Sequence, residues 1–129
     1  CTAMWALERD IPFIGTDPDI VIPAPERDVP GSGAVINAIA GVAEREPDVV
    51  LGKPSDTAVE MVRERLPYPA EECLVVGDRL NTDIALGEHA GMTTVLVRSG
   101  VTDDDALAAS AISPDYVLDD LGEIGRLIG

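Results

Sequence analysis

Two aspartates lie where residue types and spacing point most clearly to chemistry. Asp78 follows the apolar segment Val75-Val76-Gly77, and Asp83 opens the helix-like segment that comes next. In an open α/β sheet, ligands bind just beyond the carboxyl ends of the strands. Carboxylates at that place offer the hard oxygen ligands that Mg²⁺ prefers, and Mg²⁺ also binds phosphate oxygens. Alternatively, Asp78 is a turn residue and Asp83 a favourable charge at a helix N-terminus. The two together, after a strand and a glycine, favour the metal site.

Lys53 is the second chemical signal. It is the only lysine among nine basic residues, and it stands in Val50-Leu51-Gly52-Lys53-Pro54-Ser55, between a predicted strand and a predicted helix. An ammonium beside a helix N-terminus is unfavourable unless an anion lies between them. A phosphate or a carboxylate nucleophile would supply that anion, whereas a surface lysine is the simpler interpretation of this residue alone. Because Lys53 follows a strand, we expect it at the same edge of the sheet as Asp78.

The elements that must position these residues alternate along the chain. Short, apolar, β-rich runs predict strands at Pro12–Gly15, Val49–Leu51, Leu74–Val76, Thr94–Val97 and Tyr116–Leu118. Helical periodicity predicts helices at Ser32–Arg45, Pro54–Leu66, Thr82–Ala90, Asp103–Ala109 and Leu121–Ile128. Near-continuous hydrophobic strands that alternate with helices indicate a buried parallel sheet in a doubly wound α/β fold. Residues 16–31 are rich in proline and predict a loop or hairpin.

The composition excludes some classes of partner. The chain has 129 residues and a net charge of −15, which argues against nucleic acid or an anionic membrane, because both require a basic surface. No apolar run approaches the roughly 20 residues of a membrane-spanning helix, and the first ten residues do not resemble a signal peptide. The acidic residues are spread along the chain, as on a solvated acidic surface. We therefore expect a cytoplasmic protein, with a salt-adapted, halophile-like surface.

Several motifs occur in an order that resembles a known family. Gly-Lys-Pro-Ser at 52–55 is followed by Val-Gly-Asp-Arg-Leu-Asn-Thr-Asp-Ile from 76, and then by Gly-Met-Thr-Thr-Val-Leu-Val from 91, with Gly-Val at 100–101. This order is similar to that of haloacid dehalogenase (HAD) superfamily phosphatases with a large C2-type cap, the branch of the para-nitrophenyl, phosphoglycolate and pyridoxal phosphate phosphatases. Phe-Ile-Gly-Thr-Asp-Pro-Asp from 13 and Pro-Gly-Ser-Gly-Ala from 30 also resemble that branch. The resemblance runs from about residue 12 to 129.

The resemblance implies roles for individual residues. Lys53 would be the lysine that steadies the nucleophile and the phosphoryl oxygens. Asp78 would be a Mg²⁺ ligand, and Asp83 would bind the metal directly or through a water. Asn81 would lie in the vicinity of the substrate phosphate. Asp17 stands where relatives usually have Asn, in a cap segment that faces the site, and would also lie in the vicinity of the substrate.

The resemblance also implies a domain organisation. Residues 1–46 would be the terminal part of the C2-type cap, and residues 47–129 the carboxy-terminal half of a HAD core, a Rossmann-like parallel sheet with helices on both faces. The family's nucleophile motif, Asp-x-Asp-Gly-Thr, does not occur in these 129 residues, nor does its phosphate-binding Ser or Thr motif. In the family, the strand with the nucleophile lies beside the strand that ends at Asp78. We therefore expect an exposed edge on that strand, and either self-association or a partnership with an amino-terminal half.

The function expected from the resemblance is Mg²⁺-dependent hydrolysis of small organic phosphomonoesters through an aspartyl-phosphate, with little activity in this chain alone. The alternative is a non-catalytic phosphate- or metal-binding domain, or a half-enzyme completed by a separate segment. A receiver-type domain with Asp78 as phosphoacceptor is a weaker alternative. Phe13–Asp19 contains another Asp-x-Asp after a strand, but Ile20-Val21 replaces Gly-Thr, so we do not expect a nucleophile loop there. His89 is expected to be a surface or packing residue.

Overall fold

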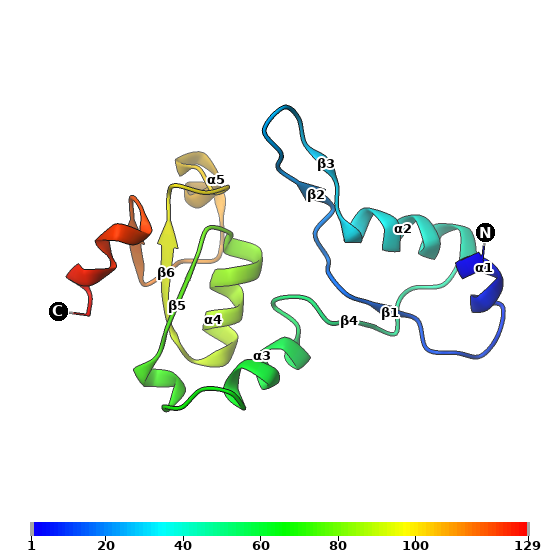
Figure 1. Ribbon diagram of the computed structural model, residues 1–129, viewed down its shortest axis with the longest axis horizontal. Coiled ribbons are helices and arrows are strands. Elements are labelled where there is room, and N and C mark those ends of the chain that lie inside the picture. Colours follow the sequence, from blue (N-terminus) through cyan, green and yellow to red (C-terminus); the bar gives the residue numbers. More distant parts are fainter. Residues whose placement is uncertain (1, 129) are drawn as a thin grey trace. The chain divides into compact units, whose positions relative to one another are not determined.

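The computed structural model of the chain describes residues 2–128, which divide into two compact units. The first unit ends at Gly52 and the second begins at Lys53, as the colours of Figure 1 allow the reader to follow. Within the described residues, no helix has the length and apolar character needed to cross a membrane. Each unit has its own strands and helices.

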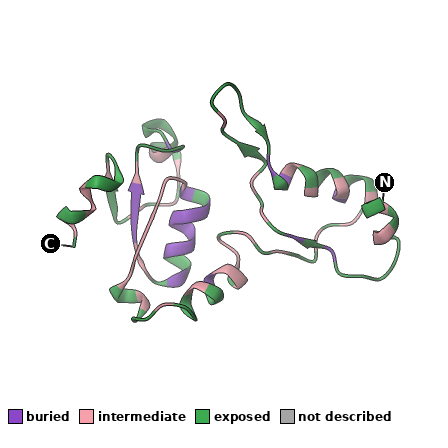
Figure 2. Ribbon diagram, in the orientation of Figure 1, coloured by how far each residue is buried: buried purple, intermediate pink, exposed green. Residues whose placement is uncertain are grey.

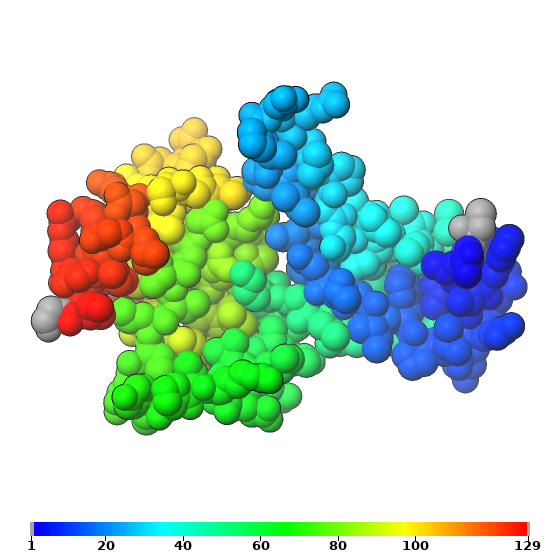
Figure 3. Space-filling view, viewed as in Figure 1, coloured from blue at the N-terminus to red at the C-terminus, as the bar shows by residue number. Residues whose placement is uncertain are grey.

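The first unit combines two helices with two small sheets. The helices are α1 (Thr2–Leu7) and α2 (Ser32–Ala43), and the strands are β1 (Ile14–Gly15), β2 (Val21–Ile22), β3 (Val29–Pro30) and β4 (Val49–Val50). Strands β1 and β4 pair in parallel, whereas β2 and β3 form an antiparallel hairpin. This hairpin confirms the prediction for residues 16–31, and its tip stands out from the rest of the unit in Figure 3.

The second unit contains a three-stranded parallel sheet in the order β5-β6-β7. Its strands are β5 (Leu74–Gly77), β6 (Thr93–Val97) and β7 (Tyr116–Leu118). Its helical segments are α3 (Asp56–Arg63), the 3₁₀ turn η1 (Ala70–Glu72), the π-helical turn η2 (Leu80–Ile84), α4 (Ala85–Ala90), α5 (Asp104–Ala109) and the 3₁₀ segment η3 (Leu121–Arg126). Among the described strands, β5 lies at an edge of this sheet, as expected, although its residues are half-buried.

The core of the second unit lies between the sheet and its helices. Ile84, Val95 and Leu96 have no exposed surface. Leu96 belongs to a cluster with Leu80 and Ile84, against which residues of α5 and the following loop pack, and a second cluster joins α3 to α4. Figure 2 shows the buried residues concentrated on α4 and β6. The elements that surround Asp78 and Asp83 therefore rest on a packed apolar core.

Most predicted elements exist, with bounds that differ for identifiable reasons. Helix α2 stops at Ala43, before Arg45, because Glu44 adopts a left-handed conformation with a φ of 49°. Helix α3 begins at Asp56, because Ser55 caps it by accepting a hydrogen bond from the Ala58 backbone N–H. Gly91 ends α4 in a left-handed conformation, as its position predicts.

Three predictions from periodicity are corrected by the structure. The strand expected at Pro12–Gly15 is only two residues long. The segment expected as a helix at Leu121–Ile128 is a 3₁₀ segment that ends at Arg126. The strand at Val49–Val50 pairs with β1 and does not join the sheet of β5, β6 and β7. Lys53 therefore follows a strand that is not paired with β5, β6 or β7, because periodicity predicts strands but does not specify their partners.

Candidate active site at the carboxyl end of β5

Asp83 is anchored by the backbone of the turn that precedes it. Its Oδ2 accepts hydrogen bonds from the backbone N–H groups of Asp78 and Arg79, at 3.3 and 3.2 Å. Gly77 makes this close approach possible, because a Cβ at that position would lie 2.2 Å from the Asp83 Cβ. The Asp83 carboxylate thus folds back over the end of β5, and its charge is stabilised by two backbone donors.

The backbone between the two aspartates forms a π-helical turn. The N–H groups of Asp83 and Ile84 both donate to the Arg79 carbonyl oxygen, at 3.0 and 3.1 Å. The sequence had predicted a helix from Thr82, and regular α-helix begins only at Ala85. π-Helical turns are rare in proteins overall, and those that do occur are often found at functional sites. Here the turn brings Asp83 back to the backbone of Asp78.

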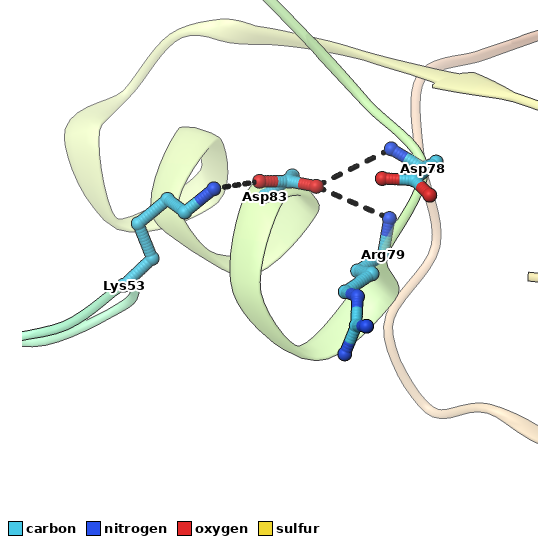
Figure 4. Close-up of polar contacts among 4 residues, drawn as sticks. All are labelled: Lys53, Asp78, Arg79 and Asp83. Carbon is cyan, nitrogen blue, oxygen red and sulfur yellow. Dashed lines mark hydrogen bonds and ion pairs between the residues drawn. The ribbon is translucent and has the colours of Figure 1, made fainter. Parts of the chain in front are cut away.

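Lys53 reaches the same carboxylate from the other side. Its Nζ lies 2.5 Å from Asp83 Oδ1, so that Asp83 is held between the ammonium and two backbone amides, as Figure 4 shows. The Lys53 side chain is 53% exposed, whereas the Asp83 side chain is only 12% exposed. The ammonium therefore has an ionic partner on the protein and a solvent-facing side on which a second anion can bind.

The coil that carries Lys53 is held against α4. His89 Nδ1 lies 3.4 Å from the Pro54 carbonyl oxygen. In α3, Arg63 donates from Nε to the Ala90 carbonyl oxygen and from a terminal nitrogen to that of His89, at 3.0 and 3.1 Å. These contacts fasten α3 to the end of α4. They confirm His89 as an exposed helix-end residue that makes a packing contact.

Asp78 is held by a different segment, the loop after β6. Its Oδ2 accepts the Val101 N–H at 2.9 Å. Its carbonyl oxygen accepts the Thr102 hydroxyl at 2.6 Å and the Thr102 N–H at 3.1 Å. A Cβ at Gly100 would lie 2.1 Å from the Asp78 Cβ. Sequence reasoning missed this contact set, although Gly100 and Val101 were part of the motif pattern, because no sequence spacing connects them to Asp78.

The two remaining predicted site residues belong to different units of the chain. Asn81 is exposed on the π-helical turn. Asp17 belongs to the first unit, where its Oδ1 accepts the Asp19 N–H at 2.8 Å. The structure thus brings together Lys53, Asp78 and Asp83. The substrate contacts expected of Asn81 and Asp17 remain predictions.

The carboxylates of Asp78 and Asp83 suit a cation that requires few protein ligands. Among residues 2–128, no group of three or more His, Cys, Asp or Glu side chains is arranged to hold a metal. Both Asp83 oxygens are engaged by N–H or ammonium donors. The contacts that the described residues make to the Asp78 carboxylate fall on Oδ2, which leaves Oδ1 for a ligand. Mg²⁺ is commonly held by one or two carboxylates together with waters and phosphate oxygens, so Asp78 fits as one ligand of such an ion.

Comparison with known proteins identifies the family of the chain. Residues 50–124 match the family described as HAD-hydrolase-like. Phosphoglycolate phosphatase 2 of Arabidopsis thaliana is 36% identical over 119 residues, which cover 90% of this chain and 39% of the relative. Glycerol-3-phosphate phosphatase of Gallus gallus is 32% identical, over 96% of this chain and 43% of the relative. The chain thus spans about two fifths of the length of these relatives.

Solved structures agree in fold. The p-nitrophenyl phosphatase from Archaeoglobus fulgidus matches with a TM-score of 0.85 and 37% identity, over 96% of this chain and 49% of that one. The 4-nitrophenylphosphatase from Thermotoga maritima matches with a TM-score of 0.87 and 35% identity, over 98% and 48%. The predicted α/β, Rossmann-like fold class is confirmed. The chain belongs to the HAD superfamily, among the phosphatases with a C2-type cap, and corresponds to their carboxy-terminal half.

Proposed function

We propose that this chain is the lysine- and metal-bearing part of a phosphomonoester hydrolase that acts on small phosphorylated metabolites. The observation that carries the proposal is the arrangement of Lys53, Asp83 and Asp78 at the carboxyl end of β5. The named relatives support the reaction class, because they are phosphatases of phosphoglycolate, glycerol 3-phosphate and nitrophenyl phosphate.

Lys53 would neutralise charge on the phosphoryl oxygens and on a carboxylate nucleophile. Its ammonium is half-exposed and is already oriented by Asp83. An oriented cation stabilises the charge of a transferring phosphoryl group without needing to reorganise during the reaction. Asp83 would act mainly as a positioning residue, since its two oxygens hold Lys53 and the backbone of Asp78 and Arg79. This differs from the expectation that Asp83 binds the metal directly or through a water.

Asp78 would hold Mg²⁺ through Oδ1. When bound, Mg²⁺ supplies Lewis-acid stabilisation of phosphate oxygens. The reaction proposed for the protein with a nucleophile is transfer of the phosphoryl group to an aspartate, followed by hydrolysis of that aspartyl-phosphate. Asp78 would place the cation beside the phosphate, and Lys53 would approach from the side of α3.

The organisation of the protein is part of the proposal. Residues 1–46 would be the terminal part of the cap, and residues 47–129 the half-core that carries the site. The protein would act in the cytoplasm, without nucleic acid or membrane partners. It would function together with an amino-terminal half that provides the nucleophile, or as a homo-oligomer.

A chimera tests the proposed function. The amino-terminal portion of the Archaeoglobus p-nitrophenyl phosphatase, which this chain does not match, is fused before residue 2, and hydrolysis of p-nitrophenyl phosphate is measured with Mg²⁺. We expect the 129-residue chain alone to show little turnover and the chimera to be active. Lys53→Ala and Asp78→Asn should each lower kcat of the chimera by about 10²–10³-fold, as for loss of an oriented electrostatic group.

Asp104→Asn is the matched control, because Asp104 is an exposed residue of α5 whose ion pair is with Arg98; its chimera should retain full activity. Circular dichroism of each variant checks that it is folded. A folded, active chimera whose Lys53→Ala and Asp78→Asn variants stay within about twofold of its rate would contradict the proposal. Robust turnover by the 129-residue chain, abolished by Asp78→Asn, would show that the site needs no further segment.

A further inference from the structure

The last two carbonyl oxygens of α4 are paired by a side chain of another helix. The two carbonyls before them accept backbone N–H groups that follow the helix, from Gly91 to Glu88 and from Met92 to Gly87, at 3.1 and 2.9 Å. The carbonyls of His89 and Ala90 accept instead from Arg63 of α3, at 3.1 and 3.0 Å. Ala90 has no exposed surface, so loss of the guanidinium would leave its carbonyl oxygen without this partner.

Helix α3 is attached to α4 at both of its ends and in its middle. At its end, Arg63 offers two donors in a rigid fork. In its middle, Val59 belongs to a buried apolar cluster with Leu86 of α4. Just before α3 begins, His89 Nδ1 lies 3.4 Å from the Pro54 carbonyl oxygen. Figure 1 allows the reader to follow α3 and α4. The position of α3 on α4 is therefore set by two polar contacts that flank an apolar one.

This attachment bears on Lys53, because Lys53 directly precedes Pro54 in the segment that leads into α3. The Lys53 ammonium pairs with Asp83, and the π-helical turn that contains Asp83 continues directly into α4 at Ala85. The partner of Lys53 thus stands before one end of α4, and the carbonyls that bind Arg63 stand at the other. The contacts form a closed ring, so that a shift of α3 on α4 would pull on the ion pair.

We propose that Arg63 is a positioning residue for the reaction, which holds α3 on the last turn of α4 and thereby keeps Lys53 against Asp83. The inference rests on the proposed function, in which the Lys53 ammonium stabilises the transferring phosphoryl group. Because the Lys53 side chain is 53% exposed, solvent competes with Asp83 for the ammonium once the ring is broken. A misplacement of about 1 Å at a reacting group can lower a rate by about a hundredfold.

The motion of Lys53 is the first readout. Lys53 is the only lysine in the chain, so the 129-residue chain labelled with ¹³C-lysine gives one set of lysine signals. Relaxation of the ε-methylene group by NMR measures how freely the ammonium moves, and Asp83→Asn, which removes the charge of its partner, gives the value for a released Lys53. We expect Arg63→Ala to move the order parameter at least about halfway from the original chain to Asp83→Asn.

Arg65→Ala is the matched control for this measurement. Arg65 is likewise exposed, but the guanidinium that binds α4 is that of Arg63, so Arg65→Ala should keep the order parameter of the original chain. Arg63→Met keeps the aliphatic stem and removes the donors, and it decides the question if Arg63→Ala does not fold.

The activity of the chimera described above is the second readout. Arg63→Ala should lower its kcat by about tenfold, and Arg63→Lys, which keeps the charge and can donate to one carbonyl, should return kcat to within about threefold of the original. Asp115→Asn controls for a loss of stability alone. It removes the carboxylate that accepts the Thr94 N–H and hydroxyl at the start of β6 in the same unit, and it should keep kcat within about twofold.

Failure of the inference and failure of the proposed function have different signatures. A folded Arg63→Ala, or in its absence a folded Arg63→Met, that keeps the Lys53 order parameter of the original chain overturns the inference, whether or not the chimera is active. An active chimera in which Arg63→Ala lowers kcat no more than Asp115→Asn also overturns it. If Lys53→Ala leaves the rate of the chimera unchanged, the proposed role of Lys53 fails, and the motion of Lys53 still decides whether Arg63 holds it in place.

Discussion

The two units of the chain differ in how much of their apolar surface they bury. In the second unit, Ile84, Val95 and Leu96 have no exposed surface. In the described part of the first unit, the buried hydrophobic residues are Phe13 and Ala40, which are 8% and 7% exposed. Large apolar side chains of that unit are exposed, among them Trp5, Ile11, Ile14, Ile20, Val21, Ile22, Val29, Val35 and Val42.

The difference shows why the candidate site can be well defined in the second unit. Lys53, Asp78 and Asp83 are positioned by β5, the π-helical turn and the loop after β6. The π-helical turn contributes Leu80 and Ile84 to the core cluster that contains Leu96, and β5 pairs with β6, the strand of Leu96. The strands of the first unit are two residues long and form one parallel pair and one hairpin. Two-stranded sheets are only marginally stable by themselves. We therefore expect its stability to be lower.

Hydrogen exchange should show the largest contrast between the units. In the 129-residue chain, the amides of β6 should exchange at least about a thousandfold more slowly than those of β1 and β4, because buried strands open only with the global transition. The measurement is native-state hydrogen exchange followed by NMR at residue resolution. The Val95 and Leu96 amides report on the second unit, and the Gly15 and Leu51 amides report on the first.

The contrast between the units would be refuted by equal protection in β1 and β6. Such a result would mean that the exposed apolar surface of the first unit is covered in solution by self-association. Repeating the exchange over a range of chain concentrations separates the two cases, because protection from association increases with concentration.

A matched pair of leucine substitutions should give the next largest effect. Leu96→Ala leaves a cavity among Leu80 and Ile84 and should lower the free energy of unfolding of the second unit by about 2–5 kcal/mol. Leu51→Ala, in the first unit, removes a side chain that is 39% exposed and should cost less than about 0.5 kcal/mol. Urea denaturation of both variants gives the two values, with the slope of the transition checked for constancy. A Leu51→Ala cost equal to that of Leu96→Ala would show that Leu51 is buried in solution.

The strand bounds of the second unit were predicted more accurately from the sequence than those of the first. Strand Tyr116–Leu118 was predicted with its observed bounds, and the strands that end at Gly77 and Val97 were predicted within one residue. Continuous apolar runs give a strong signal for the strands of a parallel sheet. In the first unit, the strands are two residues long, which is too short for a periodic pattern to form. The pairing of Val49–Val50 with β1 is a non-local fact that no local pattern contains.

The candidate site was likewise predicted from the sequence only in part. Asp78, Asp83 and Lys53 were identified because each stands between a strand and a helix, a relation that is local in the sequence. Val101 and Thr102 were missed because their contacts with Asp78 span more than twenty residues. Apart from the Thr102 hydroxyl, the donors are backbone N–H groups, which almost every residue has. The π-helical turn was missed because its sequence is compatible with a normal helix start. Prediction thus found the charged side chains of the candidate site and missed the backbone turn and the loop contacts that hold two of them.

Two carboxylates with similar contacts allow a comparison of the units at low pH, where we expect the smallest effect. In the second unit, the Thr94 N–H and then its hydroxyl, which donate to Asp115 Oδ2, hold the pKa of Asp115 below its ordinary value. In the first unit, the Phe13 N–H, followed by the charge of Arg45, lowers the pKa of Asp48. A carboxylate whose pKa is lower in the folded state stabilises the fold when ionised. Its contribution is complete above the unfolded value of about 3.8 and is lost as the pH falls through the folded pKa.

Asp115→Asn should therefore destabilise the second unit modestly at pH 7, by less than Leu96→Ala does, and the gap from the original chain should close below about pH 4. Thr94 is 1% exposed at the start of β6, so the loss should appear in the urea midpoint of the whole unit. Asp48 is exposed, and Asp48→Asn should change only the exchange rate of the Phe13 amide and its neighbours. The urea midpoint and the amide exchange rates of each variant are measured from pH 7 down to the pH at which acid unfolds the chain. If the difference in urea midpoint between Asp115→Asn and the original chain stays constant with pH, the effect comes from side-chain geometry and not from the charge. If Asp48→Asn changes the exchange rates of the β6 amides, the two units unfold as one.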